Sequence, residues 1–201
     1  MWFFLIASIT LTLSPGPDII YVLVQSMANG RQRGMAIACG LVTGVLVHTS
    51  LVAFGVAILI SQHEILYTLL KFFGSGYLLY LAFQVYNSET NIALVEIQKS
   101  RKTFLEAFKK GFVMNVLNPK VTLFFLAFLP SFIPKHSENI ILDTYVLGFV
   151  FMFQALIIFI LVSILADKLF KKWRNHQTFG LFMKYIQIIV FISLALFLWM
   201  F

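Results

Sequence analysis

An apolar run of membrane-spanning length begins the chain and is interrupted at its middle. The run extends from Trp2 to Ala28, and Ser14-Pro15-Gly16-Pro17-Asp18 interrupts it. Proline removes a backbone donor and clashes with the preceding helical turn. In hydrocarbon, the carbonyl groups released in this way must be satisfied by protein or by a water-lined cavity. The sequence therefore predicts a broken membrane span whose two halves meet at a polar site.

Composition extends this interpretation to the whole chain. Hydrophobic residues make up 60% of the 201 residues and charged residues only 11%, whereas about 25% of a soluble domain is charged. Because a span needs about 20 apolar residues, six spans are expected. They are Trp2 to Ala28, Met35 to Ile60, Leu66 to Tyr86, Phe112 to Ile133, Thr144 to Leu165 and Met183 to Phe201.

The basic residues predict the orientation of these spans. If both termini are external, all 15 Lys and Arg except Lys71, Lys120 and Lys135 face the cytoplasm, as the positive-inside rule requires. The net charge of +7 then reflects orientation and anionic lipid rather than nucleic acid. The single cysteine, Cys39, excludes an internal disulfide and a site built from several thiolates.

A weak repeat relates the two halves of the chain. The break at residues 14–18 has a counterpart in Asn118-Pro119-Lys120 of the fourth span. Three spans per half require the halves to be inverted, and interrupted spans at matching positions indicate a transporter's central site. We therefore expect an all-α membrane protein with a single domain over residues 1–201. Repeat 1 covers about 2–86, a cytoplasmic linker 87–111, and repeat 2 about 112–201.

The linker contains one helix signal. Thr103-Phe104-Leu105-Glu106 matches a capping box, in which the first and fourth side chains cap the start of a helix. This pattern predicts a short interfacial helix, and a solvated charged loop is the alternative.

Each break is suited to restart a helix near the midplane. Asn118 can act as N-cap before Pro119, and Ser14 or Gly16 can do so before Pro15 or Pro17. Helix amino termini favour anions such as a carboxylate. Asp18 and Lys120 lie at similar depth and are expected to face one another, with a third group allowed between them. An ion pair that only fixes packing is the alternative.

Other polar residues in the spans are weaker candidates. Gln25 is expected on the helix face of Asp18, as a span-lining amide or a ligand. His48 continues a stripe of small residues that predicts close helix packing. Its ring either binds a neighbouring carbonyl, binds substrate or relays a proton. Tyr77 follows two glycines. The predicted substrate and proton pathway comprises Ser14, Pro15, Gly16, Pro17, Asp18, Gln25, His48, Tyr77, Asn118, Pro119 and Lys120.

These motifs together resemble the LysE/RhtB family of amino-acid exporters. The matching segments are residues 13–18, 30–34, 40–44 with His48, 70–78, 118–120 and 128–133. The resemblance implies six spans and export of an amino acid or derivative in exchange for protons, in the plasma membrane of a prokaryote. It implies an amino-acid substrate, protons and lipid as partners, with a homodimer left open, and neither a cofactor nor enzymatic activity.

The sequence leaves two other functions as alternatives. Heavy-metal efflux is an alternative within transport, although soft metals require thiolate or imidazole clusters. A membrane-embedded enzyme or sensor is a further alternative. An enzyme needs a nucleophile within reach of a base, and Asp18 with Lys120 is the only ionisable pair that the spans offer.

Overall fold

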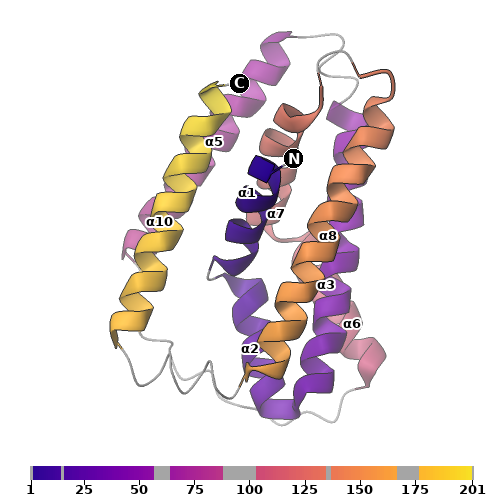
Figure 1. Cartoon of the computed structure of the whole chain (residues 1–201), viewed down its shortest axis with the longest axis vertical. Coiled ribbons are helices and arrows are strands. Elements are labelled where there is room, and N and C mark those ends of the chain that lie inside the picture. Colours follow the sequence, from indigo (N-terminus) through magenta and orange to yellow (C-terminus); the bar gives the residue numbers. More distant parts are fainter. Residues whose placement is uncertain are drawn as a thin grey trace.

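The computed structural model describes residues 2–14, 16–56, 64–87, 103–134, 137–166 and 177–200. Every regular element within these residues is a helix, so the predicted all-α class is confirmed for the described part of the chain. Figure 1 shows long helices that run roughly parallel to one axis of the molecule.

Both predicted helix breaks are present. Helix α1 (Trp2–Leu13) and helix α2 (Pro17–Asn29) meet at a bend of 54°. Helix α6 (Phe104–Val116) meets the segment Pro119–Phe132, which begins with helix α7 (Pro119–Leu123), at a bend of 50°. A proline occupies the first turn of each restarted helix, where its missing N–H needs no partner. Helix α7 continues into a π-helical turn, η2 (Phe124–Phe128), and a 3-10 turn, η3 (Leu129–Phe132).

The small residues of helix α3 (Arg31–Leu51) allow it to contact α6 backbone to backbone. A Cβ atom on Gly40 would lie 2.0 Å from the carbonyl oxygen of Phe108. A Cβ atom on Gly111 of α6 would lie 2.3 Å from the carbonyl oxygen of Ile37. Neither position therefore tolerates a side chain without separating the helices. The predicted close packing at this stripe is confirmed.

The remaining helices enclose the broken ones. Helix α8 (Ile140–Ile164) packs against α1, α2 and α3. Helix α5 (Glu64–Asn87) and helix α10 (Gln177–Met200) lie side by side along the opposite flank (Figure 1). A π-helical turn, η1 (Val52–Val56), follows α3. In Figure 1, α1 begins and α10 ends toward the upper end of the view, away from the α2–α3 turn.

Aromatic rings fill the core between α1 and the end of the α7 segment. Phe124 and Phe128 are fully buried, with ring centroids 4.9 Å apart. Phe4 of α1, also fully buried, contacts Phe132 at 5.3 Å in an edge-to-face arrangement. Such ring pairs stabilise a core beyond the area that they bury. They fix the segment that follows the second break against the first helix.

Two helices in the described residues are individually long and apolar enough to cross a membrane. They are Arg31–Gly55 and Ile140–Ile164, and each bent pair taken as one span raises the number to four. A shorter apolar helix covers Lys184–Trp199. These elements support a multi-pass membrane protein, whereas the count of six inverted spans stays a prediction.

The capping box of the linker is present, but its helix is not a separate one. The backbone N–H of Thr103 donates to Oε2 of Glu106 at 2.8 Å, and the N–H of Glu106 donates to the Thr103 hydroxyl at 3.4 Å. The helix that begins there is α6, which continues to Val116. The predicted helix is therefore present as the first part of α6 rather than as a separate short helix, and Gly111 further along packs against Ile37 of α3.

Candidate functional site

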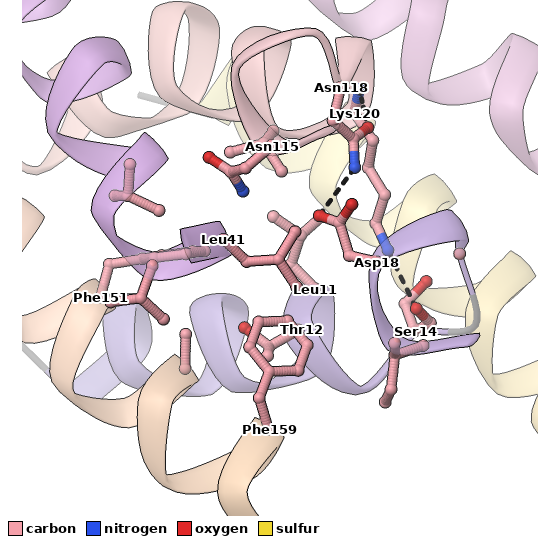
Figure 2. A pocket seen from close by; sticks show the side chains of 16 residues that line it. Leu11, Thr12, Ser14, Asp18, Leu41, Asn115, Asn118, Lys120, Phe151 and Phe159 are labelled. Carbon is pink, nitrogen blue, oxygen red and sulfur yellow. Dashed lines mark hydrogen bonds between the residues drawn. The ribbon is translucent and has the colours of Figure 1, made fainter. Parts of the chain in front are cut away.

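The two helix breaks meet at one enclosed cavity. It has a volume of about 30 Å³ and lies between the end of α1, the start of α2, the α6–α7 break, α3 and α8 (Figure 2). A polar cavity of this size accommodates water, whereas binding sites for larger organic ligands run to several hundred Å³. The cavity is therefore too small for such a ligand, and we call this arrangement closed. Its polar lining residues are Thr12, Ser14, Asp18, Asn115, Asn118 and Lys120.

Asp18 lies in the first turn of α2, and only 9% of its surface is exposed. Its Oδ2 accepts a hydrogen bond of 2.9 Å from Nδ2 of Asn118. Its Oδ1 has no hydrogen-bond partner among the described residues. The positive end of the α2 dipole adds a favourable interaction with the carboxylate. One carboxylate oxygen is thus held by Asn118, and the other is buried within reach of the Asn115 amide.

Asn118 acts at both breaks at once. Its Oδ1 accepts from the backbone N–H of Lys120 at 3.0 Å and so caps α7, as the sequence predicted. Its Nδ2 donates to Asp18 on the other half of the chain. Among side chains of this size, an amide supplies an acceptor and a donor on one planar group. Asn118 therefore fixes the start of α7 and orients the carboxylate of Asp18.

Lys120 binds the first break rather than Asp18 itself. Its Nζ donates a hydrogen bond of 3.0 Å to the carbonyl oxygen of Ser14 (Figure 2). Ser14 follows the last residue of α1, where backbone carbonyls carry partial negative charge. Asp18 and Lys120 interact electrostatically but form no direct ion pair. Asn118 links the two residues by contacting the carboxylate of Asp18 and the backbone N–H of Lys120.

Backbone geometry at the first break makes room for this lysine. A Cβ atom on Gly16 would lie only 3.3 Å from Nζ of Lys120. The hydroxyl oxygen of Ser14 is buried and has no partner among the described residues. Pro15 falls outside the described residues, whereas Pro17 and Pro119 are exposed and act through the backbone. The cluster predicted at residues 14–18 and 118–120 is thus brought together in space.

Three further candidates lie away from the cavity. Gln25 accepts hydrogen bonds from Arg33 at 2.8 Å and Asn29 at 3.1 Å, at the far end of α2. His48 is buried, and its Nε2 donates to the carbonyl oxygen of Asn115 at 3.1 Å. Tyr77 is half-buried on α5, with its ring 5.9 Å from that of Tyr80. None of the three lines the cavity.

Two polar lining residues were not identified from the sequence. Asn115 is 3% exposed, and its amide lies beside Asp18 in Figure 2. Thr12 accepts a hydrogen bond of 3.0 Å from Nε2 of Gln154 on α8. The available signals were an amide three residues before Asn118 inside an apolar run, and a hydroxyl two residues before Ser14. Neither signal specifies which way the side chain faces.

Metal-ligating side chains do not cluster in the part of the chain that the structure describes. No group of three or more His, Cys, Asp or Glu side chains suited to a metal ion occurs there. Cys39 is a partly buried free thiol on α3. The acidic and basic groups of the described cavity are Asp18 and Lys120.

Comparison with known proteins gives the family. The family described as LysE type translocator matches residues 9–200. The uncharacterised membrane protein YrhP of Bacillus subtilis is 26% identical over 177 residues, which cover 84% of this chain and 83% of that protein. Leucine efflux proteins of Salmonella choleraesuis and Salmonella paratyphi A are 30% identical over 132 residues, 66% of this chain and 62% of theirs. No solved structure matches the chain. The chain belongs to the family of LysE type translocators.

Proposed function

We propose that this protein is a secondary active exporter of an amino acid and that the cavity between the two breaks is its central site. The observation that carries the proposal is that Asp18 and Lys120 line one buried cavity without pairing directly. Burying a charge in a membrane protein costs free energy, so a charge that is buried there indicates a functional role. Because related proteins are named leucine efflux proteins, leucine is the first substrate to test.

The two charges match the two ends of an amino acid. The unpartnered Oδ1 of Asp18 is an acceptor for the substrate's ammonium group. The ammonium of Lys120 is a donor for the substrate's carboxylate. The apolar lining residues Leu41, Phe151 and Phe159 then face the substrate's side chain. A zwitterion therefore satisfies both charges without adding net charge to the interior.

Proton coupling follows from competition at one carboxylate. Asp18 carries either a proton or the substrate's ammonium, because both neutralise the same group. The breaks allow the helix halves to open toward either face of the membrane in turn. When the site is open to the outside, an external proton binds Asp18 and displaces the substrate, which is released to the outside. The resulting process is antiport, with the substrate driven outward by the proton gradient.

The test uses purified protein in vesicles loaded with leucine. At zero membrane potential, an imposed pH gradient should drive leucine against its own gradient, and downhill leucine flux should move protons in the opposite direction. Vesicles that contain the Asp18→Asn variant serve as the control. Leucine flux that does not change when the pH gradient collapses, with no accompanying proton movement, contradicts antiport. Absence of flux for every amino acid tested contradicts export.

A further inference from the structure

The ammonium group of Lys120 occupies a site built from three separate elements. Its Nζ lies 3.0 Å from the carbonyl oxygen of Ser14 at the end of α1. The same atom lies 5.8 Å from the ring centroid of Phe191 on α10. The absence of a Cβ atom at Gly16 leaves it space. These groups surround the tip of the side chain, whereas its backbone belongs to the second break.

The chemistry of this site is that of a receptor for ammonium ions. A carbonyl at a helix carboxyl terminus carries partial negative charge, and an aromatic face attracts cations through its quadrupole. Phe191 is only 1% exposed, so little water screens the attraction. The Asp18 carboxylate adds a negative charge at longer range. Any primary ammonium group presented here would meet the same partners.

Two acceptors beside this site remain unused by Lys120. Oδ1 of Asp18 and the hydroxyl oxygen of Ser14 are both buried and without partners among the described residues. An ammonium group has three N–H donors, and the structure gives Lys120 one hydrogen bond at this end. Unpaired buried acceptors are costly. A cation that reaches Asp18 and Ser14 together would therefore bind better than the tethered lysine does.

We propose that Lys120 is an internal stand-in ligand that occupies the ammonium subsite of the closed site until the substrate's ammonium displaces it. The subsite consists of the Ser14 carbonyl, the Phe191 ring and the Asp18 carboxylate. The displaced Lys120 then turns to the substrate's carboxylate. This inference rests on the proposed function and limits the substrate to compounds with an unblocked primary ammonium. An N-acylated amino acid cannot perform the exchange.

The exchange is energetically balanced because like replaces like. One ammonium leaves the Ser14 carbonyl and another arrives, so the number of buried charges at the subsite does not change. The released lysine gains a carboxylate partner in a charge-assisted hydrogen bond. Without substrate, Lys120 supplies the hydrogen-bond donor that the buried Ser14 carbonyl needs. The side chain thus stabilises the closed site and defines which cation can open it.

The test removes the tether and supplies the ammonium separately. Lys120→Ala protein in detergent is titrated with n-butylammonium, which has the four-carbon length and the charge of a lysine side chain, and binding is followed by the rise in the thermal unfolding midpoint. We expect n-butylammonium to bind this variant about tenfold more tightly than it binds the wild type. n-Butanol, which lacks the charge, should not bind.

Lys184→Ala is the matched control. Lys184 also lies 5.8 Å from an aromatic centroid, that of Tyr86, so its removal deletes a comparable lysine–aromatic contact elsewhere. No gain in amine binding is expected for that variant. Equal binding of n-butylammonium by Lys120→Ala and the wild type, or equal binding of n-butanol, overturns the proposal.

The experiment still gives an answer in the case that the Lys120→Ala variant is unstable. Recovery of folded, monodisperse protein by n-butylammonium and not by n-butanol then supports the subsite, and no recovery contradicts it. The titration requires no amino acid, so its outcome is independent of export. Amine binding without export of any amino acid leaves the subsite and removes the proposed function. Export of an amino acid without amine binding supports the proposed function and contradicts the ammonium subsite.

Discussion

Asn118 holds Asp18 across the two helix breaks, with its Nδ2 2.9 Å from the Oδ2 of the carboxylate. Lys120, two residues on, reaches back to the Ser14 carbonyl at 3.0 Å. Both donors belong to the second break and both acceptors to the first. The second half of the chain therefore supplies the hydrogen bonds that the first half needs at its interruption.

Replacement of Asn118 separates its two roles. Asn118→Ala removes the cap of α7, worth about 1 kcal/mol, and the hydrogen bond to a buried carboxylate, worth roughly 1.5 to 3 kcal/mol. Asn118→Ser keeps a capping oxygen and loses only the donor to Asp18. We expect both variants to unfold at lower temperature than the wild type in detergent, with Ala lower than Ser. Equal midpoints for Ala and Ser would show that the cap contributes nothing.

Removal of either charge should abolish export without preventing assembly. Asp18→Asn and Lys120→Met each delete one charge of the cavity, and we expect leucine efflux from reconstituted vesicles to fall to the background rate. Immunoblots of the membrane fraction check that the proteins are present. If the double variant exports normally, the charges take no part in transport. If the single variants are merely degraded, packing is the better explanation.

The breaks and the caps were predictable because their causes are local. A proline or an N-cap acts within one helical turn, so Pro17, Pro119, Asn118 and the Thr103 capping box could be located from the sequence. The small-residue stripe at Gly40 was predictable for a similar reason, since close packing requires a run of missing side chains on one face.

The membership of the cavity was not predictable in the same way. Gln25 does follow Asp18 by two helical turns, but those seven residues advance the chain about 10 Å along the axis, to the end where Arg33 binds it. His48 faces the Asn115 carbonyl because α3 and α6 cross there. Asn115 and Thr12 reach the cavity through that same long-range packing, which no local pattern encodes.

Glycine substitutions test the packing of α3 on α6. Gly40→Ala would place a Cβ atom 2.0 Å from the carbonyl oxygen of Phe108, and we expect a loss of about 1 to 3 kcal/mol from this overpacking. Gly76→Ala on α5 is the control, because a Cβ atom there meets nothing within 4 Å. That change should be neutral or stabilising by up to about 1 kcal/mol. Thermal unfolding of both variants in detergent is the measurement, and equal midpoints refute the interpretation.

Reporter fusions test the orientation. We expect a fusion after residue 102 to be active only with a cytoplasmic reporter, and fusions at either terminus to be active only with an external one. The prediction agrees with the placement of the start of α1 and the end of α10 toward one end of the molecule (Figure 1). An internal carboxyl terminus together with an external amino terminus would rule out the inverted arrangement of the two halves.

The contact of Gly40 with the Phe108 carbonyl and of Gly111 with the Ile37 carbonyl also limits how the molecule can move. Two helices packed so closely that neither glycine leaves room for a Cβ atom cannot slide past one another without first separating. We therefore expect helices α3 and α6 to move as one rigid body, with changes of shape taken up outside the contact. The interruption before Pro119 lies at the end of α6, and the one before Pro17 lies outside the pair; these are the hinges that we expect. Conformational freedom is thereby concentrated beside the two charged residues.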